Sequence, residues 1–183
     1  MKANHDRLQQ LNATGTKAIH RLFAAAPEAY ALRRFYWQLF ATLTFRRPPQ
    51  SRAHSLPKVF SWLRETAALA RIHFHGLFWV LRYEYGSCRR NGHYHLCLAG
   101  LPPALLTRQL CRLLESKWWT VVGGLSEVTL YDHTRDGVGY VLKLPSESRT
   151  YHPRNGSVLG SDGEDCEPML SASLIEGVRR GRM

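Results

Sequence analysis

Cysteine is scarce in this sequence, with four residues in 183, and no two of them form a Cys-x-x-Cys pair. That scarcity excludes a disulfide framework of the kind that holds small secreted domains together. The N-terminus has no apolar signal core, and the longest uninterrupted apolar stretches fall far short of the ~18 residues that a membrane span needs. We therefore expect a reduced, intracellular protein with no membrane partner, soluble or at most peripheral.

Acidic residues are also few: 14 Asp and Glu residues stand against 25 Lys and Arg residues, which gives a formal charge of +11. The arginines are spread through almost every segment, and such a field favours a polyanionic partner, most often nucleic acid. A ribosomal-type or membrane-surface basic protein is the alternative that composition leaves open. With 44% hydrophobic residues, the chain can form one domain with a sizeable core and is too short for a second large one.

Hydrophobic periodicity divides the chain into three parts. Residues 1–39 predict two N-terminal helices, residues 40–145 predict the main domain, and residues 146–183 predict a mostly irregular C-terminal tail with one short helix near 170–178. Within the domain, period-two and period-3.6 patterns predict these elements in order: strand 40–45, helix 57–69, strand 76–84, strand 93–99, helix 105–119, strand 125–131 and a short helix 138–144. Ser55 is a predicted cap of the first of these helices.

This order of elements is β-α-β-β-α-β, followed by the short helix. It predicts an α+β protein with a ferredoxin-like, or split βαβ, antiparallel sheet and helices packed on one face, in addition to the N-terminal helices.

Two histidines stand one residue apart inside the apolar, strand-like run of residues 92–98. Because residues i and i+2 of a strand face the same side, His93 and His95 would present two imidazoles to one point. Glu84 ends the preceding strand, and the segment between the strands has the composition of a hairpin turn. The three side chains could then hold one divalent cation and leave coordination positions open for a substrate.

Two other histidine and cysteine patterns offer alternatives. Cys97 follows the histidines on the same strand face and Cys88 lies in the turn, so a thiolate and imidazole zinc site competes with the hard-metal site. The sequence lacks the Pro-Cys-x-x-Cys of zinc deaminases, which favours the hard metal. A second pair, His73 and His75, is predicted to lie at an ordinary junction between helix and strand.

Residues 33–37 are two arginines followed directly by three aromatic residues, Phe35, Tyr36 and Trp37. Arginines beside aromatic rings can bind phosphates and stack on the bases of single-stranded nucleic acid. The alternative, which we favour from the sequence, is that the aromatic rings belong to the core and the arginines to a solvated face.

In their order along the chain, these features resemble the HUH endonucleases, and in particular the single-tyrosine rolling-circle replication initiators (Rep proteins) of small phages, plasmids and DNA viruses. Residues 40–45, FATLTF, resemble the first motif of that family. His93-Tyr94-His95 matches the second motif, and Glu84 matches the glutamate on the neighbouring strand. The third motif, Tyr-x-x-Lys on a helix after the last strand, matches Tyr140 and Lys143.

The resemblance implies a metal-dependent nickase and ligase acting on single-stranded or locally melted origin DNA. Mg²⁺ or Mn²⁺ would be held by Glu84, His93 and His95. Tyr140 would attack phosphorus and become covalently linked to the DNA, and Lys143 would help to neutralise the phosphate.

Further implications of the resemblance concern DNA contacts, partners and location. The residues implied at the DNA are Thr42, Thr44, Arg46 and Arg47. A host helicase and polymerase are implied as further partners, and the cytoplasm of a host cell as the location.

The sequence also departs from the Rep pattern. Leu144 stands where an aromatic residue is common, no second tyrosine follows one turn after Tyr140, and no helicase-like P-loop lies downstream. Two alternatives therefore stay open: a single-tyrosine HUH transposase, and a non-catalytic basic nucleic-acid-binding protein with the same sheet.

Overall fold

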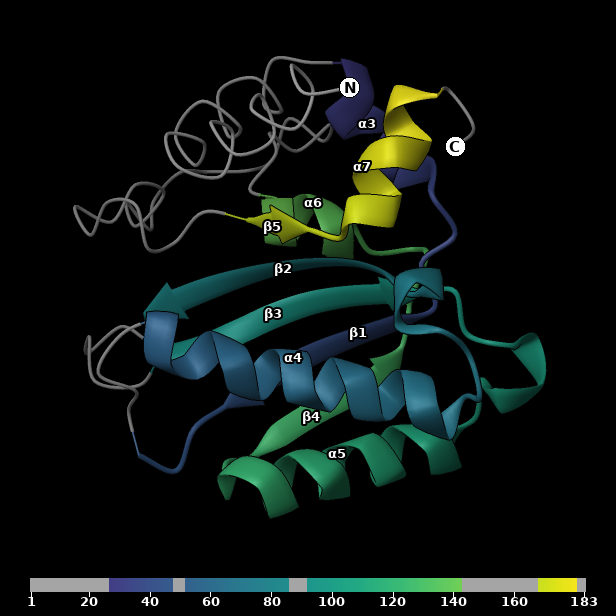
Figure 1. The fold of residues 1–183 in the computed structure, drawn as a ribbon. Helices are drawn as coiled ribbons and strands as arrows, with labels where there is room; N and C mark the ends of the chain where they lie inside the picture. Colours follow the sequence, from purple (N-terminus) through teal and green to yellow (C-terminus); the bar gives the residue numbers. More distant parts are fainter. Residues whose placement is uncertain (1–26, 48–51, 86–91, 143–167, 181–183) are drawn as a thin grey trace, which may run out of the picture.

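The computed structural model of the chain describes residues 27–47, 52–85, 92–142 and 168–180 (Figure 1). These residues form an antiparallel sheet in the strand order β4-β1-β3-β2-β5. The strands are β1 (Leu39–Thr44), β2 (Phe78–Tyr85), β3 (Gly92–Ala99), β4 (Ser126–Leu130) and β5 (Met169–Leu170). The helices are α3 (Pro27–Arg34), α4 (Arg52–Leu69), α5 (Arg108–Val122), α6 (Gly137–Leu142) and α7 (Ala172–Arg179), with short 3-10 turns η1 (Phe74–Gly76) and η2 (Pro103–Leu105).

The predicted α+β, ferredoxin-like fold is confirmed. The chain passes through β1, α4, β2, β3, α5 and β4 in that order. Strand β3 lies between β1 and β2 and is antiparallel to both, while β4 pairs with the outer edge of β1. The two crossover helices, α4 and α5, pack on the same face of the sheet, as expected (Figure 1).

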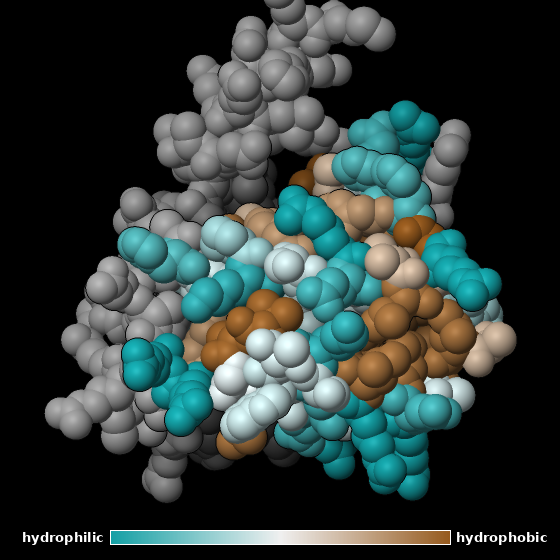
Figure 2. All heavy atoms as spheres, turned by 60° about the horizontal axis from the view of Figure 1, so that its bottom comes forward, coloured by the Kyte–Doolittle hydropathy of each residue, from teal (hydrophilic) through white to brown (hydrophobic). Residues whose placement is uncertain are grey.

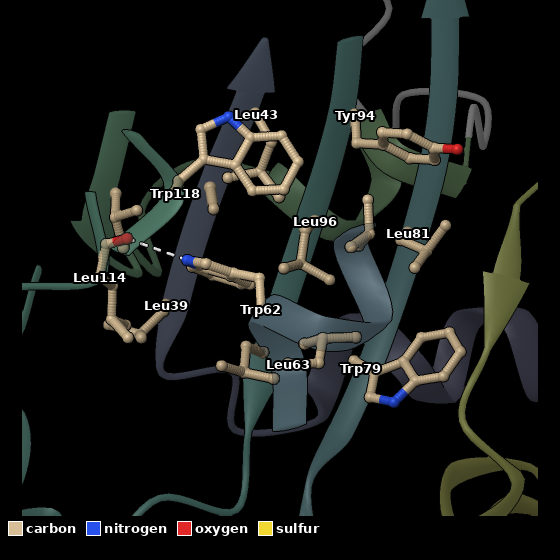
Figure 3. Close-up of a cluster of buried hydrophobic side chains, with 14 of the residues drawn as sticks. Leu39, Leu43, Trp62, Leu63, Trp79, Leu81, Tyr94, Leu96, Leu114 and Trp118 are labelled. Carbon is tan, nitrogen blue, oxygen red and sulfur yellow. Dashed lines mark hydrogen bonds between the residues drawn. The ribbon is translucent and has the colours of Figure 1, made fainter. Parts of the chain in front are cut away.

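The main core lies between this face and the two crossover helices. Every second residue of β1, from Leu39 to Leu43, is buried there, which is why the strand shows period-two alternation. Three tryptophans fill much of the space, and two of them satisfy their indole N–H groups on backbone carbonyls. Trp62 donates to the carbonyl of Leu114 at 2.9 Å (Figure 3), and Trp118 donates to the carbonyl of Thr44 at 2.7 Å.

The two crossover helices begin in different ways. Helix α5 begins at Thr107, whose hydroxyl accepts from the N–H of Leu110, and it ends at Gly123, which adopts the left-handed conformation with φ 70°. Helix α4 begins at Arg52, so the prediction of Ser55 as its cap is wrong. Ser55 is a buried residue of the helix and forms a 2.8 Å hydrogen bond with the hydroxyl of Tyr94.

The opposite face of the sheet is partly covered by α3, α6 and α7, which come from outside the two crossovers (Figure 1). A second apolar cluster lies beneath these helices: Leu32, Trp37, Val80, Cys97, Ala99, Val138, Val141, Leu142 and Leu174. Helix α7 is the short helix expected near residues 170–178. Strand β5 just before it pairs with β2, a contact that was not expected from the sequence.

Parts of several predictions lie outside the described residues. These are the helices predicted before residue 27, the last two residues of the short helix predicted over 138–144, which the structure describes as α6 up to Leu142, and the tail as far as residue 167. In the part that is described, no helix is both long enough and apolar enough to cross a bilayer.

Candidate functional site

The register of the β2–β3 hairpin brings the three candidate metal ligands together. Glu84 and His93 are directly opposite each other, and His95 lies two residues further along β3, on the same face as His93. Directly opposite residues of neighbouring strands point to the same face of a sheet. All three side chains therefore lie on the face that carries α6, away from the core beneath α4 and α5.

The distances between the donor atoms suit one cation. The Nε2 atoms of His93 and His95 are 3.0 Å apart, and Nε2 of His95 lies 3.7 Å from Oε2 of Glu84. One donor atom from each of the three residues lies within 4.8 Å of the other two. Two neighbouring ligands of an octahedral ion, each about 2.1 Å from it, are about 3.0 Å apart. The spacing and the nitrogen and oxygen donor set thus fit a divalent cation.

Thr42 contacts Nδ1 of His95, the ring nitrogen that does not lie beside the other two ligands. It is directly opposite His95 on β1, and its hydroxyl lies 3.2 Å from Nδ1 of that imidazole. If Nδ1–H donates to this oxygen, the lone pair of Nε2 is directed at the other ligands. Such contacts commonly fix the tautomer of metal-binding histidines. Thr42 therefore touches the site through His95, a role that strand alternation alone did not indicate.

Arg82 is a neighbour that our sequence reasoning missed. It is directly opposite His95 on β2, is 8% exposed, and its Nε lies 3.5 Å from Oε1 of Glu84. The second carboxylate oxygen, Oε2, is the one nearer to His95. The signal that could have found Arg82 is its position two residues before Glu84 on the same strand face.

Tyr140 lies over the metal-ligand group, on α6. Its hydroxyl is 3.4 Å from Nε2 of His95 and 3.5 Å from Oε2 of Glu84. The tyrosine and imidazole rings meet edge to face, with centroids 5.0 Å apart. Tyr140 is 47% exposed, so its phenol is both next to the ligand atoms and open to solvent.

The short helix α6 is fixed in place by contacts at its beginning. One oxygen of Asp136 accepts from the N–H of Gly139 at 3.0 Å, and the other lies 2.7 Å from the guanidinium of Arg33 on α3. The phenol of Tyr131 accepts from the N–H of Val138 at 3.0 Å. These bonds satisfy N–H groups that a helix start leaves open, and they orient the helix that carries Tyr140.

The remaining predicted residues are more scattered. The hydroxyl of Thr44 donates to the carbonyl of Leu125 at 2.6 Å, and Thr44 is directly opposite His93. Arg46 and Arg47 are exposed just beyond β1. Lys143 lies outside the described residues, so its position relative to Tyr140 stays a prediction.

The zinc alternative has little support among the described residues. Cys97 is fully buried in the apolar cluster under α6, and the group that could hold a metal there contains no cysteine. Burial raises the pKa of the Cys97 thiol well above its ordinary value, and the carboxylate of Asp136 adds to this effect, which opposes thiolate formation. Cys88 lies outside the described residues. The second histidine pair lies in and next to η1, between α4 and β2, as expected.

Comparison of the chain with protein-family models, with curated proteins and with solved structures returned no match. The evidence for the function of the chain is therefore the geometry of Glu84, His93, His95 and Tyr140 and the charge of the chain.

Proposed function

We propose that the chain is a metal-dependent, single-tyrosine strand transferase of the HUH type, which initiates rolling-circle replication by nicking and rejoining single-stranded origin DNA. The observation that carries the proposal is the position of the Tyr140 hydroxyl, within 3.5 Å of donor atoms on both His95 and Glu84. A nucleophile so close to a group suited to a cation is the arrangement that phosphodiester cleavage requires.

In the proposed reaction the phenolic oxygen of Tyr140 forms a bond to phosphorus, and the bond from phosphorus to the 3′ oxygen of the preceding nucleotide breaks. The protein then carries the 5′ phosphate, and the other DNA end is a free 3′ hydroxyl. Rejoining is the reverse step, with the hydroxyl attacking the phosphotyrosine. Mg²⁺ or Mn²⁺ bound by Glu84, His93 and His95 would offset the phosphodiester charge and orient the phosphorus.

Two neighbouring residues support the ligands in this proposal. Thr42 orients the imidazole of His95 through Nδ1, and Arg82 lies at the oxygen of Glu84 that is farther from His95. Lys143, three residues after Tyr140, would add positive charge near the phosphate. The Tyr-x-x-Lys spacing favours an initiator over a single-tyrosine transposase, although both would use the same chemistry.

The test is covalent capture. The purified protein is incubated with a pool of labelled single-stranded DNA and Mn²⁺, and the products are separated on a denaturing gel. We expect a protein–DNA adduct that disappears when EDTA replaces the metal. Tyr140→Phe removes one oxygen from an exposed side chain, so the variant should fold normally and form no adduct.

The matched control is Tyr36→Phe, the same change at another exposed tyrosine, which should leave adduct formation intact. Adduct formation by the Tyr140→Phe protein, or peptide mapping of the nucleotide to a different tyrosine, would contradict the assignment. Metal-independent DNA binding without any adduct would support a non-catalytic binding protein instead.

A further inference from the structure

Two aromatic rings form an exposed stack at the end of the sheet away from the metal-ligand group. Tyr36 lies before β1 and His133 after β4; their ring centroids are 4.9 Å apart, with an interplanar angle of 21°. Tyr36 is 68% exposed, although the two aromatic residues on either side of it, Phe35 and Trp37, are packed into the cluster beneath α3 and α6. A large ring held in a fixed stack in solvent is a surface on which another flat ring can lie.

Packed neighbours fix the positions of both rings. Trp37 is fully buried and donates its indole N–H to the carbonyl of Leu32 at 2.8 Å, which fixes the backbone next to Tyr36. On the other side, Tyr131 packs edge to face against His133, with centroids 4.9 Å apart, and its N–H bonds to the carbonyl of Gln38 at 2.8 Å. The stack is therefore part of the folded sheet end, which lowers the entropy cost of binding a ligand there.

The stack is linked to the metal-ligand group through Tyr131 and helix α6. Tyr131 contacts α6, the helix that carries Tyr140, through its hydroxyl. Gln38 next to the stack and Thr42 next to His95 are four residues apart on one extended segment, about 13 Å at ~3.3 Å per residue. A single DNA strand of several nucleotides can therefore contact both places.

The charge around the stack suits a nucleic acid better than an apolar partner. Arg34 and Arg135 are exposed and stand two residues from Tyr36 and from His133 in the sequence, on a chain with a formal charge of +11. The nearby carboxylate of Asp132 accepts a hydrogen bond from the hydroxyl of Thr134 at 2.6 Å and forms an ion pair with Arg135 at 3.3 Å. Arginine beside an open aromatic ring provides the phosphate contact and the stacking surface that single-stranded DNA requires.

We infer that Tyr36 and His133 form an aromatic platform on which a base of the bound single-stranded DNA stacks, away from the nucleotide whose phosphate lies at the Tyr140 hydroxyl. The inference deepens the proposed function, because it locates a second contact for the same DNA substrate. It assigns Tyr36 to binding and gives it no part in phosphoryl transfer.

The experiment compares two oligomers of equal charge in EDTA, where no strand transfer occurs. One is an oligothymidylate of about 12 nucleotides, and the other has the same length and backbone with abasic sites. Fluorescence anisotropy gives the dissociation constant of each. The native protein should bind the oligothymidylate more tightly, and Tyr36→Ala should weaken that binding roughly tenfold while leaving the abasic oligomer unchanged.

Tyr36→Phe keeps the ring and should keep native affinity for both oligomers. Trp119→Ala is the matched control, since it removes another exposed aromatic ring, from α5 on the opposite face; it should change neither affinity. Native-like binding by the Tyr36→Ala protein, an equal loss in Trp119→Ala, or equal affinity of the native protein for both oligomers would overturn the platform. Metal-dependent adduct formation is measured in a separate experiment. If no adduct forms but Tyr36→Ala still weakens oligothymidylate binding, only the proposed function is rejected.

Discussion

Strand β3 has two faces with different side chains and different tasks. Toward α4 and α5 it presents Tyr94, Leu96 and Leu98, each at most 1% exposed. Toward α6 it presents His93 and His95, whose nitrogens meet at 3.0 Å. The same backbone thus anchors the core with one set of residues and holds the candidate metal ligands with the set between them.

The two faces are also covered in different ways. The core face lies under α4 and α5, helices of 18 and 15 residues, whose outer surface mixes hydrophilic and apolar patches (Figure 2). The site face lies under α3, α6 and α7, helices of eight, six and eight residues. Short helices gain little from their own backbone bonds and depend on tertiary contacts. Substitutions on the core face should therefore affect stability first, and those on the site face should affect activity first.

The largest effect should follow loss of both imidazoles. We predict that the double variant His93→Ala, His95→Ala loses Mn²⁺ binding and that its adduct formation falls by on the order of 10³-fold or more. Calorimetric titration with Mn²⁺ and the adduct gel measure these two quantities. Binding of single-stranded DNA in EDTA should stay close to native, and cleavage at the native rate would reject the metal assignment.

Leu96 follows His95 on β3 and faces the core, so its substitution should lower stability and leave activity unchanged. Leu96→Ala removes a fully buried side chain from the main core, so we expect the free energy of unfolding to fall by about 2–5 kcal/mol. Urea denaturation measures this loss. Adduct yield per folded molecule should be unchanged. Thr129→Ala, at an exposed position of β4, is the control and should shift stability by less than about 0.5 kcal/mol.

The core face and the ligand group were both predictable from the sequence, because each depends on period-two alternation and on neighbouring elements. Apolar residues at 94, 96 and 98 indicated a buried face, and the histidines between them had to share the other face. A hairpin after Glu84 required that strand to pair with β3. Local pattern and short connections therefore sufficed for the arrangement of β1 to β4 and for three residues of the site.

Contacts between distant segments were not predictable in this way. The sequence does not show that Tyr36 is exposed while Trp37 is buried, because that choice depends on how α3 packs against α6. Pairing of β5 with β2 joins segments about 90 residues apart, as the bond between Trp79 and Ser171 illustrates. The contact of Thr42 with His95 likewise follows from the register between β1 and β3, which no single stretch of sequence displays.

A smaller effect on the site face is expected at Thr42. Thr42→Val keeps the β-branched shape of the strand residue but removes the oxygen that lies at Nδ1 of His95. We predict a 10- to 100-fold loss of Mn²⁺ affinity, the range typical of such supporting hydrogen bonds. Thr42→Ser should restore it. Thr44→Val is the matched control, because the hydroxyl of Thr44 bonds to the backbone of Leu125; an equal loss in both variants would contradict the role of Thr42.

The arginines after β1 should change the salt dependence of DNA binding. Each arginine that contacts a phosphate of single-stranded DNA contributes about 0.7 to the slope of log affinity against log salt. We predict that the double variant Arg46→Gln, Arg47→Gln lowers this slope by about 1.4, since both residues are exposed beside the site end of β1. The double variant Arg108→Gln, Arg112→Gln changes two exposed arginines of α5 and should leave the slope unchanged. Equal slopes for both variants would show that binding does not distinguish the two faces.

The smallest effect concerns Tyr131, which supports the beginning of α6. Burial raises the pKa of its phenol from near 10 to about 12; the N–H of Val138 opposes this rise, and the Cys97 thiol and Asp136 carboxylate add to it. Because the folded pKa is above the unfolded value, the contribution of the neutral phenol to stability is fully present below pH 10. It is lost as the pH rises from about 10 to about 12.

Tyr131→Phe removes this titration together with the bond to Val138. Below pH 10 we expect the variant to be about 1 kcal/mol less stable than the native protein, the usual worth of one hydrogen bond. Above pH 10 the native protein loses the contribution of Tyr131 and the variant has none to lose, so the difference between their unfolding free energies should shrink. Urea denaturation of both proteins from pH 8 to pH 11.5 measures that difference. A constant difference across the range would mean that the phenol titrates alike in the folded and unfolded chains, and that the beginning of α6 is more open to water than its contacts indicate.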